Sequence, residues 1–268
     1  MDWNNVLTAA ILFASLGVAF GVVLAVASRV FAVKEDGRIA RITEALPGAN
    51  CGACGYSGCA AYAAAIVNGE ASPDRCMAGG QRAAEVIGEV MGVPVVAAAP
   101  MRAQVMCSGN RSAAHYKYRY VGAQDCVAAA RMGGGDKCCP NGCVGLGTCA
   151  AACPYGAIEV KDGLACVKSE LCRGCGACVS SCPKNIIRMI PQEATHWVGC
   201  LSVESGKITR SQCDVGCISC RICEKNCPVG AISVSDFVAR IDYEKCIGCG
   251  KCAEKCPRHI IHFTEKKL

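Results

Sequence analysis

The chain has 268 residues, of which 26 are cysteine, and its formal net charge is +6 at pH 7. So many cysteines are otherwise typical of small secreted domains held together by disulfides, but this chain is long and its cysteines recur at short fixed spacings, which argues against a disulfide framework. The positive charge does not indicate nucleic-acid binding, because only 5% of the residues are aromatic and the sequence contains no recognisable recognition module.

An uncharged apolar segment lies at the N-terminus. No charged residue occurs between Trp3 and Ser28, and the apolar run 6–26 is long enough to cross a bilayer, which takes about 20 residues. A cleaved signal peptide would place basic residues before a shorter apolar core, whereas the early charge here is Asp2. We therefore expect residues 1–33 to form a single-pass transmembrane anchor.

The residues around this segment predict its orientation and a partner. Four basic residues follow it: Arg29, Lys34, Arg38 and Arg41. By the positive-inside rule, the bulk of the chain then lies in the cytoplasm of a bacterium or archaeon, where thiols stay reduced. Within the segment, Gly17 and Gly21 form a GxxxG pair that would let a helix of another membrane protein of the same complex approach closely. The alternative is a plain anchor that tolerates small residues.

Four cysteines follow the anchor at the spacing CxxCxxxxCx16C: Cys51, Cys54, Cys59 and Cys76. The first three lie in a glycine-rich loop whose backbone amides can approach thiolate sulfur and donate hydrogen bonds to it. The flanking segments 58–67 and 80–91 are rich in alanine and have helical periodicity. We expect a small helical domain at 34–92 that binds one [4Fe–4S] cluster through these cysteines, followed by a proline-containing linker at 93–106.

The rest of the chain carries cysteine motifs of the bacterial ferredoxin type. Four CxxxCP sequences begin at Cys149, Cys178, Cys223 and Cys252, and each of the last three completes a CxxCxxC run. In this pattern three thiolates bind one cubane cluster, while the cysteine before proline binds the neighbouring cluster. Zinc is the main alternative metal, but zinc sites are usually made of two separated cysteine pairs.

These motifs form an internal repeat. Adding 74 to the residue number maps nine cysteines onto nine others: Cys126, Cys139, Cys143, Cys149, Cys153, Cys172, Cys175, Cys178 and Cys182. Between them, YGAIEVKDGLACVKSELC matches VGAISVSDFVARIDYEKC, and both segments predict a hairpin of two short strands. We expect an α+β, multi-domain chain in which two tandem double-cluster ferredoxin modules, at 107–193 and 194–268, follow the anchor and the single-cluster domain.

The crossover rule predicts the ligands of these modules. In the second module, one cluster takes Cys217, Cys220, Cys223 and Cys256, and the other takes Cys246, Cys249, Cys252 and Cys227. In the first module, one cluster takes Cys172, Cys175, Cys178 and Cys153. The remaining site is irregular, because position 146, where Cys220 maps, is leucine. Its predicted ligands are Cys139, Cys143, Cys149 and Cys182, with Cys138 as an alternative to Cys139.

The cysteines left over predict a sixth cluster besides these five. Its expected ligands, which would bridge the two modules, are Cys107, Cys126, Cys200 and Cys213. The alternative is that these four are buried free thiols, which are common in protein cores. Cys138 and Cys166 are expected to be spare. Because an oxidised cluster with its four thiolates carries a charge of about −2, six clusters would change the formal charge from +6 to roughly −6.

The order of these elements resembles the B subunit of the Rnf complex, the ion-translocating ferredoxin:NAD oxidoreductase, in its long form with additional clusters. The resemblance covers essentially the whole chain. It implies a membrane-anchored electron-relay subunit of a translocase. Soluble reduced ferredoxin would deliver electrons to the clusters, which pass them toward membrane and flavin-bearing subunits and finally to NAD, while Na⁺ or H⁺ moves outward.

On this reading the chain itself needs no catalytic acid, base or nucleophile. We expect NAD and flavin to bind elsewhere, because the sequence shows no GxGxxG followed by an acidic residue at Rossmann spacing and no recognisable flavin-attachment signal. Two other functions fit the same motifs. One is a membrane-tethered polyferredoxin electron-transfer subunit of a hydrogenase, formate or corrinoid enzyme, and the other is a non-redox iron–sulfur sensor.

Basic residues near the last motif predict either a docking patch for ferredoxin, through electrostatic steering, or an ordinary solvated face. They are Lys245, Lys251, Lys255, Arg258, Lys266 and Lys267. The four histidines are expected to be ordinary surface or packing residues: His115, His196, His259 and His262.

Overall fold

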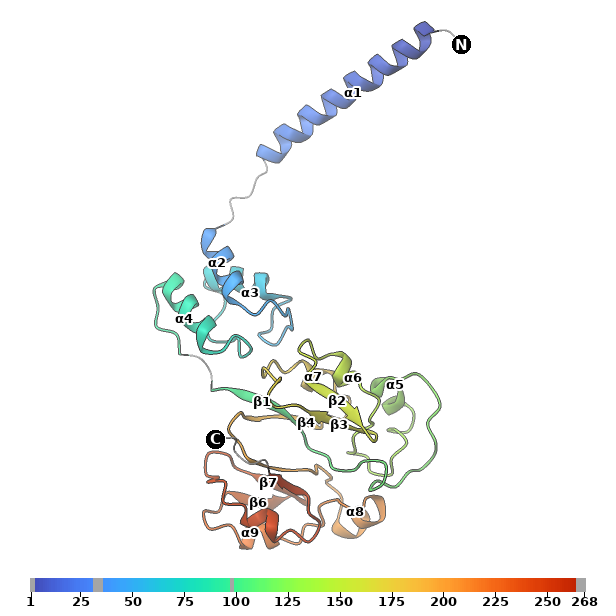
Figure 1. Cartoon of the computed structure of the whole chain (residues 1–268), viewed down its shortest axis with the longest axis vertical. Helices are drawn as coiled ribbons and strands as arrows, with labels where there is room; N and C mark the ends of the chain where they lie inside the picture. Colours follow the sequence, from blue (N-terminus) through green and yellow to red (C-terminus); the bar gives the residue numbers. More distant parts are fainter. Residues whose placement is uncertain (1–2, 31–35, 97–98, 264–268) are drawn as a thin grey trace.

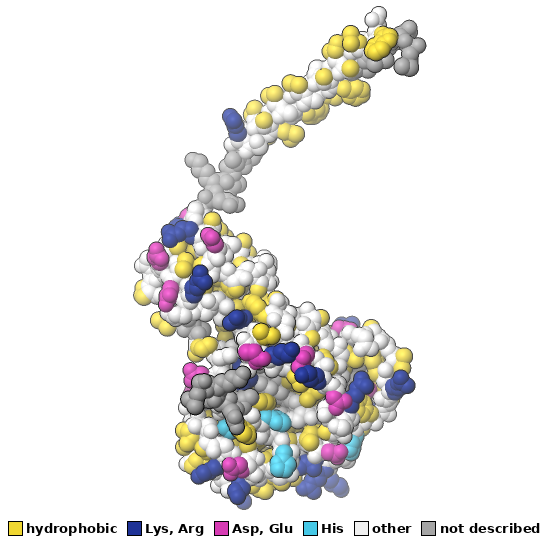
Figure 2. Space-filling model, in the orientation of Figure 1, with side chains coloured by type: hydrophobic (Ala, Val, Ile, Leu, Met, Phe, Trp, Pro, Cys, Tyr) yellow, Lys and Arg dark blue, Asp and Glu magenta, His cyan; other side chains and the backbone are white. Residues whose placement is uncertain are grey.

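The computed structural model describes residues 3–30, 36–96 and 99–263 (Figure 1). Its first element is the helix α1 (Trp3–Val30), in which the window Ala10–Arg29 has a mean hydropathy of 2.5 and is not buried by any other part of the chain. Figure 2 shows hydrophobic side chains along this helix. Among the described residues, α1 is the one helix long and apolar enough to span a membrane, as the sequence predicts.

Three helices form the next unit: α2 (Gly37–Ala45), α3 (Cys59–Val67) and α4 (Gly80–Met91). α2 begins after Asp36, whose Oδ1 accepts a hydrogen bond from the Arg38 amide at 2.9 Å and caps the helix. The core between the helices is filled by side chains that are at most 2% exposed, among them Ile42, Tyr62, Ile66 and Ile87. This core holds the start of α3, and with it Cys59, in a fixed place.

The strand β1 (Met101–Val105) lies in the segment 93–106 that the sequence predicts to be a linker. It pairs antiparallel with β4 (Ile187–Pro191), with Ala103 opposite Met189. Because the partner strand lies at the far end of the module, no local hairpin pattern marks β1 in the sequence. The first module therefore begins at β1 rather than at residue 107, and the connection from the helical unit is shorter than predicted.

Each module contains two two-stranded sheets and short helices that follow its cysteine loops. In the first module, β1 and β4 form one sheet, and the hairpin of β2 (Ile158–Lys161) and β3 (Leu164–Val167) forms the other. Asp162 and Gly163 form the tight turn of this hairpin with φ angles of 47° and 68°. The helices of this module are α5 (Cys126–Arg131), α6 (Thr148–Ala151) and α7 (Ala177–Ser181).

The second module repeats this plan. β5 (His196–Val198) pairs antiparallel with β8 (Ile261–Phe263), and β6 (Ile232–Ser235) forms a hairpin with β7 (Val238–Ile241). The helices are α8 (Gly206–Gln212), α9 (Ile222–Lys225) and α10 (Lys251–Glu254). Cysteines belong to the hydrophobic core of both modules, so their side chains point inward rather than to solvent.

A short segment at 113–116 joins the two modules. The His115 amide donates a hydrogen bond to the carbonyl oxygen of Gln212 at 2.9 Å, and the Asp214 amide donates to the carbonyl oxygen of Ala113 at 2.8 Å. This part of the first module therefore lies against the end of α8 in the second. The contact brings cysteines from both modules to one place.

Candidate iron–sulfur centres

The N-terminal site is a cavity lined by the four cysteines that the sequence predicts together: Cys51, Cys54, Cys59 and Cys76. The side-chain oxygen of Asn50 accepts a hydrogen bond from the Cys59 amide at 2.8 Å, which ties the loop to the start of α3. The Tyr62 hydroxyl donates to the carbonyl of Ser72 at 2.8 Å and accepts from the Arg75 amide at 3.1 Å, which holds the chain leading to Cys76. Burial raises the pKa of the Cys76 thiol, and the charges of the other three thiolates add to the rise.

The Cys246 site is a cavity in the second module, lined by His196 and four cysteines: Cys227, Cys246, Cys249 and Cys252. The Ala231 amide donates a hydrogen bond to Cys227 Sγ at 3.2 Å. Burial raises the pKa of Cys227, but the backbone amides of residues 229–232 outweigh burial and lower the pKa overall. The chain therefore stabilises a thiolate here before any metal binds.

The Cys217 site is the partner of the Cys246 site and contains Cys217, Cys220, Cys223 and Cys256. Burial raises the pKa of Cys223 to about 12, and the thiolate charges of the other three add to the rise. Cys217, Cys223 and Cys256 lie in one core cluster of the second module, and the spacing groups Cys220 with them. Cys220 is exposed at this site, as Cys249 is at the Cys246 site.

The Cys172 site of the first module shows the same arrangement with Cys153, Cys172, Cys175 and Cys178. The Ala157 amide donates to Cys153 Sγ at 3.3 Å, and the Ala103 amide of β1 donates to Cys172 Sγ at 3.4 Å. Burial raises the pKa of Cys178 to about 12, with contributions from the other three thiolates. The strand missed in the sequence thus supplies a hydrogen bond to a predicted ligand.

The Cys143 site differs from the grouping expected from the sequence. The cavity is lined by Cys126, Cys143, Cys149 and Cys182, and Cys139 does not take part in it. Asp125 caps α5 through a 2.7 Å hydrogen bond from the Ala128 amide, and Thr148 Oγ1 accepts from the Cys126 amide at 2.7 Å. These bonds hold the start of α5 against the start of α6, so Cys126 lines the cavity, whereas Leu146 does not.

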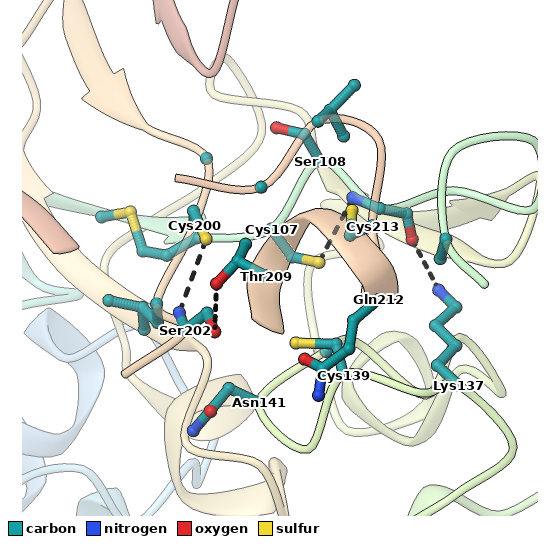
Figure 3. A pocket seen from close by; sticks show the side chains of 18 residues that line it. Cys107, Ser108, Lys137, Cys139, Asn141, Cys200, Ser202, Thr209, Gln212 and Cys213 are labelled. Carbon is teal, nitrogen blue, oxygen red and sulfur yellow. Dashed lines mark hydrogen bonds between the residues drawn. The ribbon is translucent and has the colours of Figure 1, made fainter. Parts of the chain in front are cut away.

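The inter-module site is a cavity lined by Cys107, Cys139, Cys200 and Cys213 (Figure 3). It lies where the sixth cluster was expected, with Cys139 in place of Cys126. Each module contributes two cysteines in equivalent positions. Cys107 and Cys200 each lie two residues beyond the first strand of their module, and Cys139 and Cys213 are related by the repeat.

The hydrogen bonds of the inter-module site repeat this two-fold arrangement. Cys107 Sγ accepts from the Gly109 amide at 3.4 Å, and Cys200 Sγ accepts from the Ser202 amide at 3.5 Å. Burial raises the pKa of Cys139 and of Cys213. In each case a hydrogen bond from the backbone amide two residues further on lowers the pKa and offsets part of this rise. Four thiols, each with an amide donor at the same offset, therefore line one cavity.

The residues present fit a [4Fe–4S] cluster at these sites. Four cysteines line each of the four cavities described above, as expected if one kind of group fills them all. Asn141 and Gln212 line the inter-module cavity, and the side-chain oxygen of each is buried without a partner. A Cβ on Gly79 would lie 3.2 Å from Cys76 Sγ, so glycine leaves room beside this sulfur. A mononuclear zinc site requires at least three His, Cys, Asp or Glu side chains close enough to bind one metal ion. The described ranges contain no such group.

The N-terminal site approaches the first module at Tyr155. The Tyr155 hydroxyl is buried without a hydrogen-bond partner. Burial raises the pKa of Tyr155 to about 12, and thiolates of both sites add to it, Cys175 on one side and Cys51 on the other. The repeat places Val229 at the equivalent position of the second module, and that side chain is 40% exposed. The thiolates of the helical unit and of the first module thus both act on this tyrosine.

The remaining predicted residues lie outside the six sites. Neither Cys138 nor Cys166 lines any of the cavities described above. In the basic group, Lys245 forms a 3.0 Å ion pair with Asp242, and Arg258 Nη2 donates to the carbonyl of Cys213 at 2.8 Å. Arg258 is thus held against the inter-module site rather than free on the surface. Lys266 and Lys267 lie outside the described residues.

The histidines have varied surroundings. His196 is buried and its Nε2 has no partner, whereas the ring of His262 shares a 2.6 Å hydrogen bond with Ser108 Oγ. Burial lowers the pKa of both rings, so both are neutral near pH 7. His115 lies 3.3 Å from Asp214 at the surface.

Comparison with protein-family models gives three matches. Residues 46–78 match a family described as "Putative Fe-S cluster", and residues 171–231 and 216–261 each match a "4Fe-4S dicluster domain". The match to 171–231 runs from the end of the first module into the second. The motifs of the two modules are thus similar enough for one dicluster model to match the second half of the first module together with the first half of the second module.

Curated relatives match nearly the whole chain. The B subunit of the ion-translocating oxidoreductase complex of Methanosarcina acetivorans is 42% identical over 251 residues, 93% of this chain and 95% of the relative. The B subunit of the Na⁺-translocating ferredoxin:NAD⁺ oxidoreductase complex of Acetobacterium woodii is 42% identical and covers 96% and 78% of the two chains. The B subunit of the proton-translocating ferredoxin:NAD⁺ oxidoreductase complex of Clostridium ljungdahlii is 37% identical and covers 96% and 92%.

Proposed function

The chain belongs to the family of B subunits of the ion-translocating ferredoxin:NAD oxidoreductases, the Rnf complexes, and we propose that it conducts electrons from soluble ferredoxin through six [4Fe–4S] centres toward the other subunits. It is an iron–sulfur electron-relay subunit of such a complex, with ferredoxin-type dicluster domains and membrane association through an apolar N-terminal helix. The number of centres, their ligands and the ferredoxin partner are our inferences.

The observation that carries the proposal is that each of four cavities is lined by four cysteines. The motif spacing assigns eight more cysteines to the Cys172 and Cys217 sites. When bound, each cluster takes up and releases a single electron. The chain supplies the thiolates, the backbone amides that donate to sulfur, and the apolar surroundings that exclude water. NAD and flavin bind to other subunits in this proposal, because the sequence shows no GxGxxG followed by an acidic residue at Rossmann spacing.

The proposed topology follows from the residues around α1. The helix crosses the cytoplasmic membrane of a bacterium or archaeon once, and the basic residues after it keep the modules in the cytoplasm. Gly17 and Gly21 carry no side chain, so another helix could approach α1 closely at this face. We assign this face of α1 to a helix from another membrane protein of the complex.

The proposal predicts the iron content of the chain. Six sites of four irons give about 24 iron atoms per polypeptide after anaerobic purification, whereas five sites give about 20. The Cys166→Ala variant should keep all of them, because this thiol lies outside the six sites. A value near 8 would contradict the tandem arrangement of modules.

Pairs of substitutions test which cysteines share a site. Cys139→Ser with Cys213→Ser should lose about four irons, because both residues belong to the inter-module site. Cys139→Ser with Cys143→Ser should lose about eight, because these residues belong to different sites. The grouping expected from the sequence alone predicts the reverse. Iron analysis of both double variants, with Cys138→Ser in parallel, therefore decides between the two groupings.

A further inference from the structure

Two cations are buried in the described part of the chain, Arg102 and Lys137, each 4% exposed, and no Asp or Glu among the same residues is buried with them. A buried charge is costly unless an opposite charge or good hydrogen bonds compensate it. Arg102 donates to Gln104 and to the carbonyl of Ala194 and lies over the ring of Trp197. In the described ranges, no aromatic ring lies beneath the Lys137 ammonium and no carboxylate forms an ion pair with it.

The ammonium of Lys137 is fixed by two backbone carbonyls. Its Nζ donates to the oxygen of Gly109 at 2.6 Å and to the oxygen of Gly163 at 2.8 Å. These bonds hold the group in place but bring no negative charge. The backbone of Lys137 is itself held by a bridge to Tyr116, in the segment that joins the two modules.

Lys137 lines the inter-module cavity, and Figure 3 shows its amine directed toward the Gly109 backbone at the edge of that cavity. Gly109 also places its amide against Cys107 Sγ at 3.4 Å. The charge of Lys137 reaches the neighbouring Cys143 site as well, where it opposes the burial that raises the pKa of Cys143 to about 11. The repeat places Ser211 at the equivalent position, so the second module has no buried lysine there; its cation near this cavity is the half-buried Arg258, which donates to the carbonyl of Cys213 at 2.8 Å.

We propose that the Lys137 ammonium is a buried counter-charge of the inter-module centre, additional to the half-buried Arg258, and raises its reduction potential. Reduction by ferredoxin adds one electron and no proton, and changes the charge of the cluster with its thiolates from about −2 to about −3. A fixed cation in a poorly screened interior stabilises the more negative state. The inter-module centre thereby retains an electron more readily than the Cys217 and Cys246 sites, which have no buried cation in the described part of the chain. This inference rests on the proposed six-centre relay.

Redox titration of the full-length chain, followed by electron paramagnetic resonance, tests the inference. The signal of the inter-module centre is identified as the one lost in Cys213→Ser. In Lys137→Met, the equilibrium constant for its reduction should fall at least tenfold, which is about 59 mV for a one-electron couple. Lys137→Gln, which keeps a hydrogen-bond donor but no charge, should behave in the same way, and Lys137→Arg should stay close to the native chain.

Lys117→Met is the matched control. Lys117 Nζ also donates to a glycine carbonyl, that of Gly133 at 2.8 Å, but its side chain is exposed. Replacement of Lys117 by Met should leave the reduction potential of the inter-module centre unchanged. The inference is wrong if Lys137→Met and Lys137→Gln keep their iron and titrate like the native chain.

Two further measurements keep the test decisive. If the uncharged variants lose the centre, the native chain is titrated alone, and an inter-module signal at a lower potential than those of the Cys217 and Cys246 sites overturns the inference. If Cys213→Ser removes neither iron nor a signal, the inter-module centre itself is absent and the proposed six-centre relay fails.

Discussion

Removal of iron from the purified chain is expected to unfold both ferredoxin-type modules. Their helices α6, α9 and α10 have four residues each, and their sheets have two strands, which is too little to be stable alone in water. Buried cysteines form part of both cores. In small metal-binding domains the metal contributes about 10 kcal/mol or more, which is comparable to the whole stability of a typical domain, roughly 5–15 kcal/mol.

The helical N-terminal unit provides an internal comparison for this experiment. Its core of Ile42, Tyr62, Ile66 and Ile87 includes no fully buried cysteine among the described residues. After anaerobic chelation, peptide-resolved hydrogen exchange should show protection lost across 101–263 and partly kept in 37–91. Reconstitution with iron and sulfide should restore the hydrogen-exchange protection across 101–263. Equal protection of the modules before and after chelation would show that they fold without metal.

The parts of the molecule that could be predicted are those set by local sequence. The uncharged run 6–26 specifies an apolar helix by itself, and the CxxCxxC runs place three sulfurs around one centre because their spacing allows little else. The hairpins follow from turn residues such as Asp162 and Gly163 between short apolar strands. The cavities at the N-terminal site and the Cys246 site are lined by the same four cysteines that the spacing groups together.

The exchange of Cys126 and Cys139 could not be predicted from the repeat. An offset of 74 pairs Cys126 with Cys200, although the structure uses the first inside a module and the second between modules. The difference arises because Leu146 leaves one position of the Cys143 site without a sulfur, and α5 brings Cys126 to it. That placement depends on the contacts of Asp125 and Thr148, which sequence spacing does not reveal.

Two other residues were missed in the sequence for different reasons. Nothing in the sequence distinguishes Lys137 from the exposed lysines, because its burial results from contacts with two distant carbonyls. Tyr155 could have been noticed, since it is an aromatic residue where the repeat has Val229. A difference between two otherwise similar repeats indicates a contact that only one of them makes.

Loss of the N-terminal centre is expected to disconnect the modules from the rest of the complex. This centre belongs to the unit that follows the apolar helix α1 in the sequence, and the charge of its Cys51 acts on Tyr155 and Cys175 of the first module. It is the one cysteine set in the described residues between α1 and β1. We therefore expect electrons that leave the modules toward the membrane subunits to pass through it.

Cys54→Ala with Cys59→Ala, measured in membranes that hold the whole complex, should lower ferredoxin-dependent NAD reduction at least about a hundredfold, equivalent to roughly 2.7 kcal/mol of added barrier. Reduction of the five remaining centres by ferredoxin should stay as fast as in the native chain. Cys166→Ala should leave both rates unchanged. Tyr155→Val, which installs the residue of the second module, should keep the iron content and slow only the passage to NAD. Rapid NAD reduction by a chain that has lost these four irons would place the exit of electrons in the modules instead.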